Sequence, residues 1–201
     1  MAQKLKMIAL GGLNEIGKNM YVYEYGGELI VVDAGLAFPD DEMLGVDLVI
    51  PDISYLIKNK KRVRGIILTH GHEDHIGSLP SVLREVNVPV YATKLTAGIV
   101  SNKLEEHNLL SKTKIKIVAA GDTVRLGNFR EEFIHVNHSI ADAVALAITT
   151  PLGTVIHTGD YKLDTTPIQG KMMDIARLGA LGNAGVLALF GESTNVEHPG
   201  Y

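Results

Sequence analysis

The sequence contains no cysteine among its 201 residues, which excludes both disulfide bonds and thiolate zinc sites. It also has no apolar run that approaches the length needed to span a bilayer. Residues 1–6 lack the long apolar core of a secretory signal peptide. From these absences we expect a soluble, cytoplasmic protein with no membrane partner.

The sequence also lacks a net positive charge. The formal net charge of -4 argues against an electrostatic grip on nucleic acid by the whole surface. A local basic run at residues 58–64 is either a patch of that kind or a solvated loop before a buried strand. The 46% hydrophobic and 21% charged residues are ordinary for a globular domain, and the length suits one domain with a substantial core.

The strongest pattern is the run Thr-His-Gly-His-Glu-Asp-His at residues 69–75, directly after an apolar segment that predicts a buried strand. Imidazole and carboxylate are ligand types that suit zinc and related divalent ions. In a tight turn, His70 and His72 can face one ion while Asp74 and His75 face another. The alternative is an accidental histidine-rich loop. The pattern favours a site for two metal ions.

Hydrophobic patterning and turn residues predict an alternation of strands and helices. Strands are expected at residues 5–10, 20–25, 28–33, 63–68, 88–92, 114–119, 123–126, 129–137, 143–149, 154–157 and 185–190. Helices are expected at residues 52–59, with Asp52 as N-cap, and at 76–86, 93–108 and 172–181. Residues 36–51 predict an acidic surface loop. Two stacked sheets flanked by helices, an α/β sandwich, fit this order.

Further ligand candidates stand at strand ends. His138 follows one predicted strand, and Asp160 follows another across a turn that Gly159 permits. Alone, each would be read as a cap or a satisfied core group, but beside the run at 69–75 each becomes a candidate ligand. Asp33 also ends an apolar strand. It either caps the following loop or hydrogen-bonds a metal-ligating histidine.

The remaining histidines are not assigned as ligands, although one of them, His157, is a candidate partner for a ligand. The others are His107, His135 and His198. The glycine-rich loop at residues 11–19 has two open readings: a cradle for a phosphate, or a plain hairpin connection.

Several of these motifs together resemble the metallo-β-lactamase superfamily. The resemblance is carried by residues 69–77, His138, the Gly159–Asp160 turn and Asp33, which matches the family's first motif. Residues 11–19, 137–140 and 192–200 narrow it to the ribonucleases J, a β-CASP group within that superfamily. One departure is Glu192, where the family usually has aspartate in an Asp-Ser-Thr-Asn run.

The resemblance implies an α/β fold, the metallo-β-lactamase αββα sandwich. It also implies that residues 1–201 form the N-terminal part of that domain and end about where a β-CASP insertion would begin. A last metal-ligating histidine would lie in the missing part. We therefore expect an incomplete sandwich and a fragment that is inactive by itself.

The implied activity is hydrolysis of RNA phosphodiesters by a hydroxide activated on two zinc ions, with Mn²⁺ or Mg²⁺ as alternatives. The implied ligand roles are His70, His72 and His138 on one ion, Asp74 and His75 on the second, and Asp160 between both. Asp74 and His75 would also be catalytic, and Asp33 would support a ligand. RNA is the implied partner, with endonucleolytic and 5′-to-3′ exonucleolytic cleavage in RNA maturation and decay, and the full-length protein would be a homo-oligomer. Two alternatives are a thioesterase or lactonase of the same superfamily and a metal-binding fragment that cleaves nothing.

Overall fold

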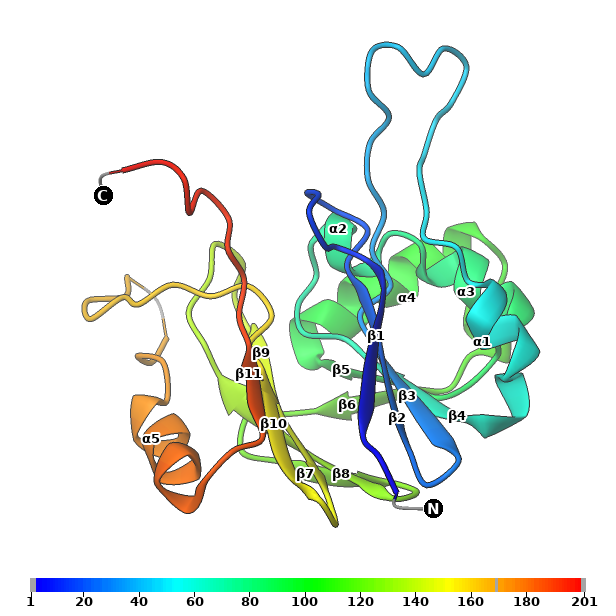
Figure 1. Cartoon of the computed structure of the whole chain (residues 1–201). Coiled ribbons are helices and arrows are strands. Elements are labelled where there is room, and N and C mark those ends of the chain that lie inside the picture. Colours follow the sequence, from blue (N-terminus) through cyan, green and yellow to red (C-terminus); the bar gives the residue numbers. More distant parts are fainter. Residues whose placement is uncertain (1–2, 169, 200–201) are drawn as a thin grey trace.

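The computed structural model describes residues 3–168 and 170–199, and in it two β-sheets face each other with helices on their outer sides (Figure 1). The first sheet contains, in order across it, β1 (Lys6–Gly11), β2 (Met20–Tyr25), β3 (Glu28–Val32), β4 (Val63–Ile67), β5 (Val90–Thr93) and β6 (Ile115–Val118). The second contains β11 (Ala188–Phe190), β10 (Gly153–His157), β9 (Val144–Thr150), β8 (Phe129–His135) and β7 (Thr123–Leu126). The helices are α1 (Ser54–Lys58), α2 (Glu73–Ile76), α3 (Leu79–Glu85), α4 (Lys94–Glu106) and α5 (Ile175–Ala184), with short 3₁₀ turns at Lys60–Arg62 and Leu110–Lys112.

Alternation of side chains along the strands produces these layers. Val22 and Val31 point to the outer face of the first sheet and join a core cluster with α1, α3 and α4. Their neighbours Tyr23 and Ile30 point the other way and pack against the second sheet around Phe133. A third cluster lies between the second sheet and α5. The predicted αββα sandwich is therefore confirmed.

Strand direction brings particular strand ends together. Strands β3, β4, β5 and β6 run parallel, so their carboxyl ends share one edge of the first sheet. Strands β8 and β10 both run antiparallel to β9, so they share a direction in the second sheet. The loops that carry the predicted ligands follow β3, β4, β8 and β10.

The helix predicted at residues 76–86 is confirmed as α3 but begins later than predicted, because a break separates α3 from α2, to which Ile76 belongs. The backbone groups at the break bond to other segments. The Asp74 carbonyl accepts the Asn19 N–H at 3.0 Å, and the Ser78 N–H donates to the Ala34 carbonyl at 2.8 Å. These contacts replace the bond between residues 74 and 78 that a continuous helix would make.

Two other helix boundaries differ from the predictions. Asp52 accepts the Ser54 N–H at 2.8 Å, but the N-cap position of α1 is Ile53. The last helix begins at Ile175, later than predicted, because Asp174 caps it by accepting the Arg177 N–H at 2.9 Å.

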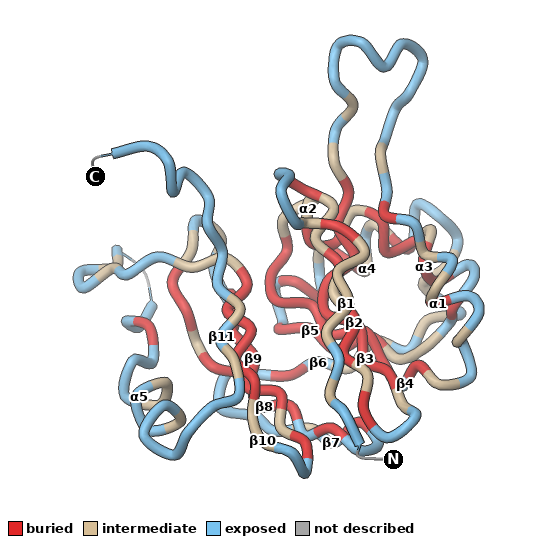
Figure 2. The backbone as a smooth tube through the Cα atoms, in the orientation of Figure 1, coloured by how far each residue is buried: buried red, intermediate tan, exposed pale blue. Residues whose placement is uncertain are grey.

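The predicted acidic loop after β3 is confirmed as a surface feature. It projects away from both sheets, and its exposure is visible along most of its length (Figure 2). An isolated bridge between Ala37 and Val49 closes its base. Among the described residues, no helix has both the length and the apolar character needed to cross a membrane.

Candidate metal centre

The two sheets meet at a cluster of imidazole and carboxylate side chains. The turn after β4 supplies His70, His72 and His75, the loop after β8 supplies His138, and the turn after β10 supplies Asp160. Within this cluster, two groups of three side chains bring their ligand atoms within 4.8 Å of one another. Side chains that lie 90 residues apart in sequence thus share one site because both sheets end there.

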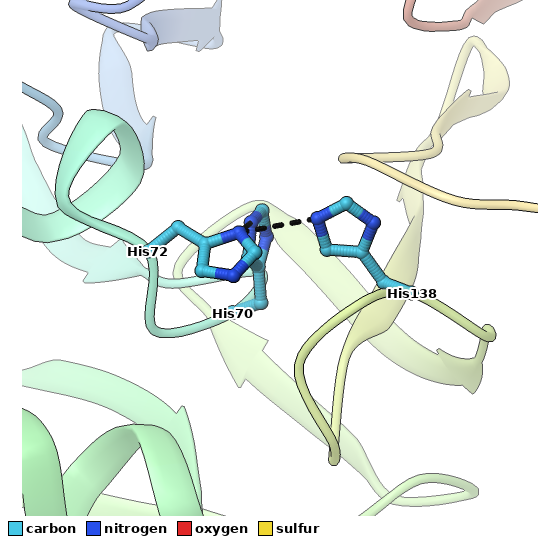
Figure 3. A group of neighbouring side chains, drawn as sticks. All are labelled: His70, His72 and His138. Atoms are coloured by element: carbon cyan, nitrogen blue, oxygen red, sulfur yellow. Dashed lines mark hydrogen bonds between the residues drawn. The ribbon is translucent and has the colours of Figure 1, made fainter.

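The first group consists of His70, His72 and His138 (Figure 3). The Nδ1 atom of His72 lies 3.1 Å from Nε2 of His70 and 3.1 Å from Nε2 of His138. One ring nitrogen cannot satisfy both neighbours with a single proton. Tetrahedral zinc with Zn–N bonds of about 2.0–2.1 Å would place its nitrogen ligands about 3.3 Å apart, close to the spacing observed. The group therefore fits a divalent cation.

The second group consists of His70, His75 and Asp160. The Nε2 atom of His75 lies 3.3 Å from one oxygen of Asp160 and 3.5 Å from an oxygen of Asp74. The other oxygen of Asp160 lies 3.7 Å from Nε2 of His138. Asp160 thus presents one oxygen to each group, which is the arrangement that a bridging carboxylate requires. Its role as a bridging ligand stays a prediction.

One detail differs from the expected division of ligands. His72 belongs to the first group, and His75, in the helical turn at residues 73–76, belongs to the second, but His70 is not confined to one group. His70 instead belongs to both groups. Its ring centroid lies 4.8 Å from that of His72 and 4.1 Å from that of His75.

Asp33 is fully buried and contacts the turn at residues 69–75. Its carboxylate accepts the Thr69 N–H at 2.8 Å and the Thr69 hydroxyl at 2.9 Å. It also contacts Nδ1 of His75 at 2.8 Å. Of the two open readings, these contacts favour the one in which Asp33 hydrogen-bonds a candidate ligand histidine, and the backbone that Asp33 holds is that of the turn at residues 69–75. An Nδ1–H bonded to Asp33 leaves Nε2 of His75 free to act as a ligand.

Electrostatics favour neutral imidazole in one part of the cluster and ionised carboxylate in another. Burial, reinforced by the charge of His75, lowers the pKa of His70, and burial likewise lowers the pKa of His138. Burial raises the pKa of Asp160, but the hydrogen bond and charge of His75 outweigh it, so that this pKa lies below its usual value. For His75, burial is outweighed by Asp33 and Asp160, which raise its pKa. A divalent cation would replace the proton on His75, because metal ligands bind in their deprotonated form.

Three groups flagged from the sequence lie outside the cluster. The buried His157 places Nδ1 3.0 Å from the Tyr23 hydroxyl, and no hydrogen bond to a candidate ligand is seen for it among the described residues. His135 contacts the Lys171 carbonyl at 2.9 Å instead of the metal groups. The basic run at residues 58–64 leads into the opposite end of β4 from His70, so it does not line the centre.

Sequence reasoning missed two side chains beside the second group, Asn19 and Tyr21. The loop before them is the connection between antiparallel strands β1 and β2, as the hairpin reading required. The end of this loop nevertheless reaches the turn that contains His70, His72 and His75, where Nδ2 of Asn19 lies 3.1 Å from Nε2 of His75. No ligand spacing in the sequence signals this contact, because it joins residues 56 positions apart.

The chain thus has an αββα sandwich fold, and its histidines and an aspartate cluster where the two sheets meet. These two features together define a class of metal-binding α/β proteins. The chain belongs to the metallo-beta-lactamase superfamily, whose family profile matches residues 13–171. The resemblance stated from the motifs is thus confirmed at the level of the superfamily.

The narrower resemblance is also confirmed by similarity along nearly the whole chain. The chain is 48% identical over 200 residues to "Ribonuclease J" of Synechocystis sp., covering 98% of this chain and 31% of that protein. It is 44% identical over 199 residues to "Ribonuclease J2" of Bacillus subtilis, covering 99% of this chain and 36% of that protein. The chain therefore spans about a third of the length of these relatives.

Solved structures support the fold alone. The Zn²⁺-bound PqqB of Methylobacterium extorquens aligns over 90% of this chain and 61% of its own, with a TM-score of 0.59 and 13% identity.

The segment at residues 192–200 also contributed to the resemblance, and its last residue, Gly200, lies outside the described residues.

Proposed function

We propose that this chain carries the metal centre of a metal-dependent ribonuclease that hydrolyses RNA phosphodiesters. The observation that carries the proposal is the pair of ligand groups that share His70 and are linked by Asp160, in a chain 44–48% identical to ribonucleases J. Two adjacent cation sites suit phosphodiester hydrolysis, in which charge develops on both the attacking and the leaving oxygen.

In this proposal His70, His72 and His138 hold one cation, and Asp74, His75 and Asp160 contribute to the second. The three imidazoles favour zinc at the first position, with Mn²⁺ or Mg²⁺ as alternatives. When bound, the cations would generate a nucleophile from water at neutral pH and neutralise charge on the scissile phosphate.

The residues of the chain have distinct tasks in this reaction. Asp33 and Thr69 hold the turn, and Asp33 keeps the Nδ1 proton of His75 in place. Asp74 is half-exposed beside the second group, where its carboxylate can accept a proton from an attacking water. Such chemistry occurs at the phosphate, so we expect little dependence on base identity.

Several finer features belong to the proposal. They are endonucleolytic and 5′-to-3′ exonucleolytic cleavage, a role in RNA maturation and decay, and homo-oligomerisation of the full-length protein. For residues 1–201 alone we expect no cleavage, because the net charge of -4 gives little grip on a polyanion.

The test is cleavage of a 5′-labelled RNA by the intact protein after chelation and reloading with Zn²⁺, Mn²⁺ or Mg²⁺. We expect metal-dependent cleavage that His72→Ala abolishes and that an exposed-residue control, Leu13→Ala, leaves unchanged. Hydrolysis of a thioester or lactone without RNA cleavage would instead indicate another hydrolase of the superfamily. RNA cleavage by residues 1–201 alone would overturn the expectation for the isolated chain.

A further inference from the structure

The loop between β1 and β2 is hydrogen-bonded through the backbone of Asn19 to the turn at residues 69–75. The N–H of Asn19 donates to the Asp74 carbonyl at 3.0 Å, and its carbonyl accepts the Gly35 N–H at 2.9 Å. Gly35 allows this approach, since a Cβ there would lie 1.6 Å from the Asp74 carbonyl oxygen. The position of Asn19 is thus fixed on both sides next to two candidate ligands.

The side chain of Asn19 is directed at the second ligand group. Its amide nitrogen lies 3.1 Å from Nε2 of His75 and 3.4 Å from an oxygen of Asp74. Because Nδ1 of His75 faces Asp33, Nε2 is the ring atom free for a cation, and Asp160 lies 3.3 Å from it. The amide therefore lies within reach of a cation bound to these side chains.

The hydrogen bonds of the Tyr21 hydroxyl favour, when a cation is bound, an Asn19 amide turned so that its oxygen and nitrogen exchange places. The Tyr21 hydroxyl lies 3.2 Å from the Gly12 carbonyl and 3.2 Å from Oδ1 of Asn19, but it has one proton for these two acceptors. A half-turn of the amide lets Nδ2 donate to Tyr21 while Tyr21 donates to Gly12. The amide oxygen then faces Nε2 of His75 and the carboxylate of Asp74, where a bound cation would attract it.

We propose that Asn19 is a ligand of the second cation site and presents Oδ1 to the ion, with Tyr21 holding the amide in that orientation. This inference rests on the proposed function only in requiring a cation at that group. From the described residues, the donors would then be one imidazole, two carboxylates and one amide carbonyl. Oxygen-rich sets suit Mn²⁺ and Mg²⁺, whereas the all-imidazole first group suits Zn²⁺. The two sites are therefore expected to differ in metal preference.

The test is titration calorimetry of the chelated intact protein, first with Zn²⁺ alone and then with Mn²⁺ alone. For wild type we expect two classes of site. Asn19→Ala should weaken the second class, and above all its Mn²⁺ binding, by at least about 10-fold, since removing a group that only orients a metal ligand already costs that much. The first class should be unchanged. Asn102→Ala, an exposed asparagine on α4, is the matched control.

Asn19→Asp separates a ligand from a hydrogen-bond donor. Aspartate presents oxygen in either orientation, so we expect it to retain or strengthen Mn²⁺ binding. If Asn19 instead acted by donating its N–H to Asp74, the added carboxylate would repel Asp74 and weaken binding as much as alanine does. That result, or unchanged second-class binding in Asn19→Ala, would overturn the inference.

One further measurement and the wild-type titration keep these outcomes distinct. Thermal unfolding of each chelated variant reports whether the fold is retained, and a variant that fails to fold is replaced in the comparison by the isosteric Asn19→Asp. If wild type binds neither cation, the proposed function fails together with this inference. If wild type binds both and Asn19→Ala has no effect, only the inference fails.

Discussion

The carboxyl group of Glu131 is buried between the two sheets, and neither of its oxygens has a hydrogen-bond partner within the described structure. Its strand neighbours Phe129 and Phe133 point into the same apolar core. Across the sheet it pairs with Val124 on one side and Ile148 on the other. Such surroundings disfavour a charge, and burial raises the pKa of Glu131 well above its ordinary value.

This raised pKa makes the free energy of unfolding depend on pH. Between the ordinary value of 4.5 and the higher native value, Glu131 is protonated in the folded protein and ionised in the unfolded chain. Unfolding then releases a proton, so the contribution of Glu131 to stability is complete below the unfolded pKa and is lost as pH rises. The slope is about 1.4 kcal/mol for each pH unit within that interval.

Glu131→Gln removes the ionisation and nearly preserves the shape. We expect its free energy of unfolding, measured with urea in the presence of a chelator, to exceed that of wild type by a margin that grows as the pH rises above the ordinary value of 4.5. Titrations of all other groups are common to both proteins and cancel in the difference.

The neighbouring Glu132 gives an opposite control. It pairs with Arg177 at 2.5 and 2.8 Å, and the hydrogen bond to Arg177 is the main cause of its lowered pKa. Its stabilising contribution is present above the unfolded pKa and is lost as pH falls, so Glu132→Gln should destabilise at neutral pH and less at acid pH. A difference between Glu131→Gln and wild type that does not change with pH would refute the account of Glu131.

Three other substitutions test packing and the metal-bearing turn. His75→Ala in the intact protein should abolish RNA cleavage while the fold persists, although loss of the imidazole partner of the buried Asp33 should reduce stability by urea unfolding; wild-type turnover would contradict the ligand assignment. Gly35→Ala should be destabilising in thermal unfolding, because its Cβ would overlap the Asp74 carbonyl, and unchanged stability would show that the turn can move. Phe133→Ala should cost about 3–5 kcal/mol by urea unfolding, and a loss below about 1 kcal/mol would contradict its place in the core.

Much of the fold followed from the sequence because strand alternation and glycine turns act locally. The predicted strand at residues 123–126 and the hairpin at residues 20–33 match the structure closely. The helix at residues 76–86 begins later than predicted because distant backbone groups bond to Asp74 and Ser78. A one-dimensional pattern contains no signal for such tertiary bonds.

In the candidate site as well, local sequence patterns revealed some residues, and tertiary contacts hid another. The run at residues 69–75 was visible because its ligands lie close together in sequence, and strand ends indicated His138 and Asp160. Asn19 was missed because an asparagine after a glycine-rich loop usually serves a turn. Only the pairing of β1 with β2 and the approach of Gly35 bring its amide to His75.

The ligand groups draw His70, His72 and His75 from the first sheet and His138 and Asp160 from the second, so a bound cation would tie the two sheets together. It would act as a reversible cross-link between segments distant in the chain, absent from the unfolded state. Free cation at 100 times its dissociation constant would then add about 2.7 kcal/mol to the free energy of unfolding. The supply of metal would thereby change the fraction of this chain that is folded at equilibrium.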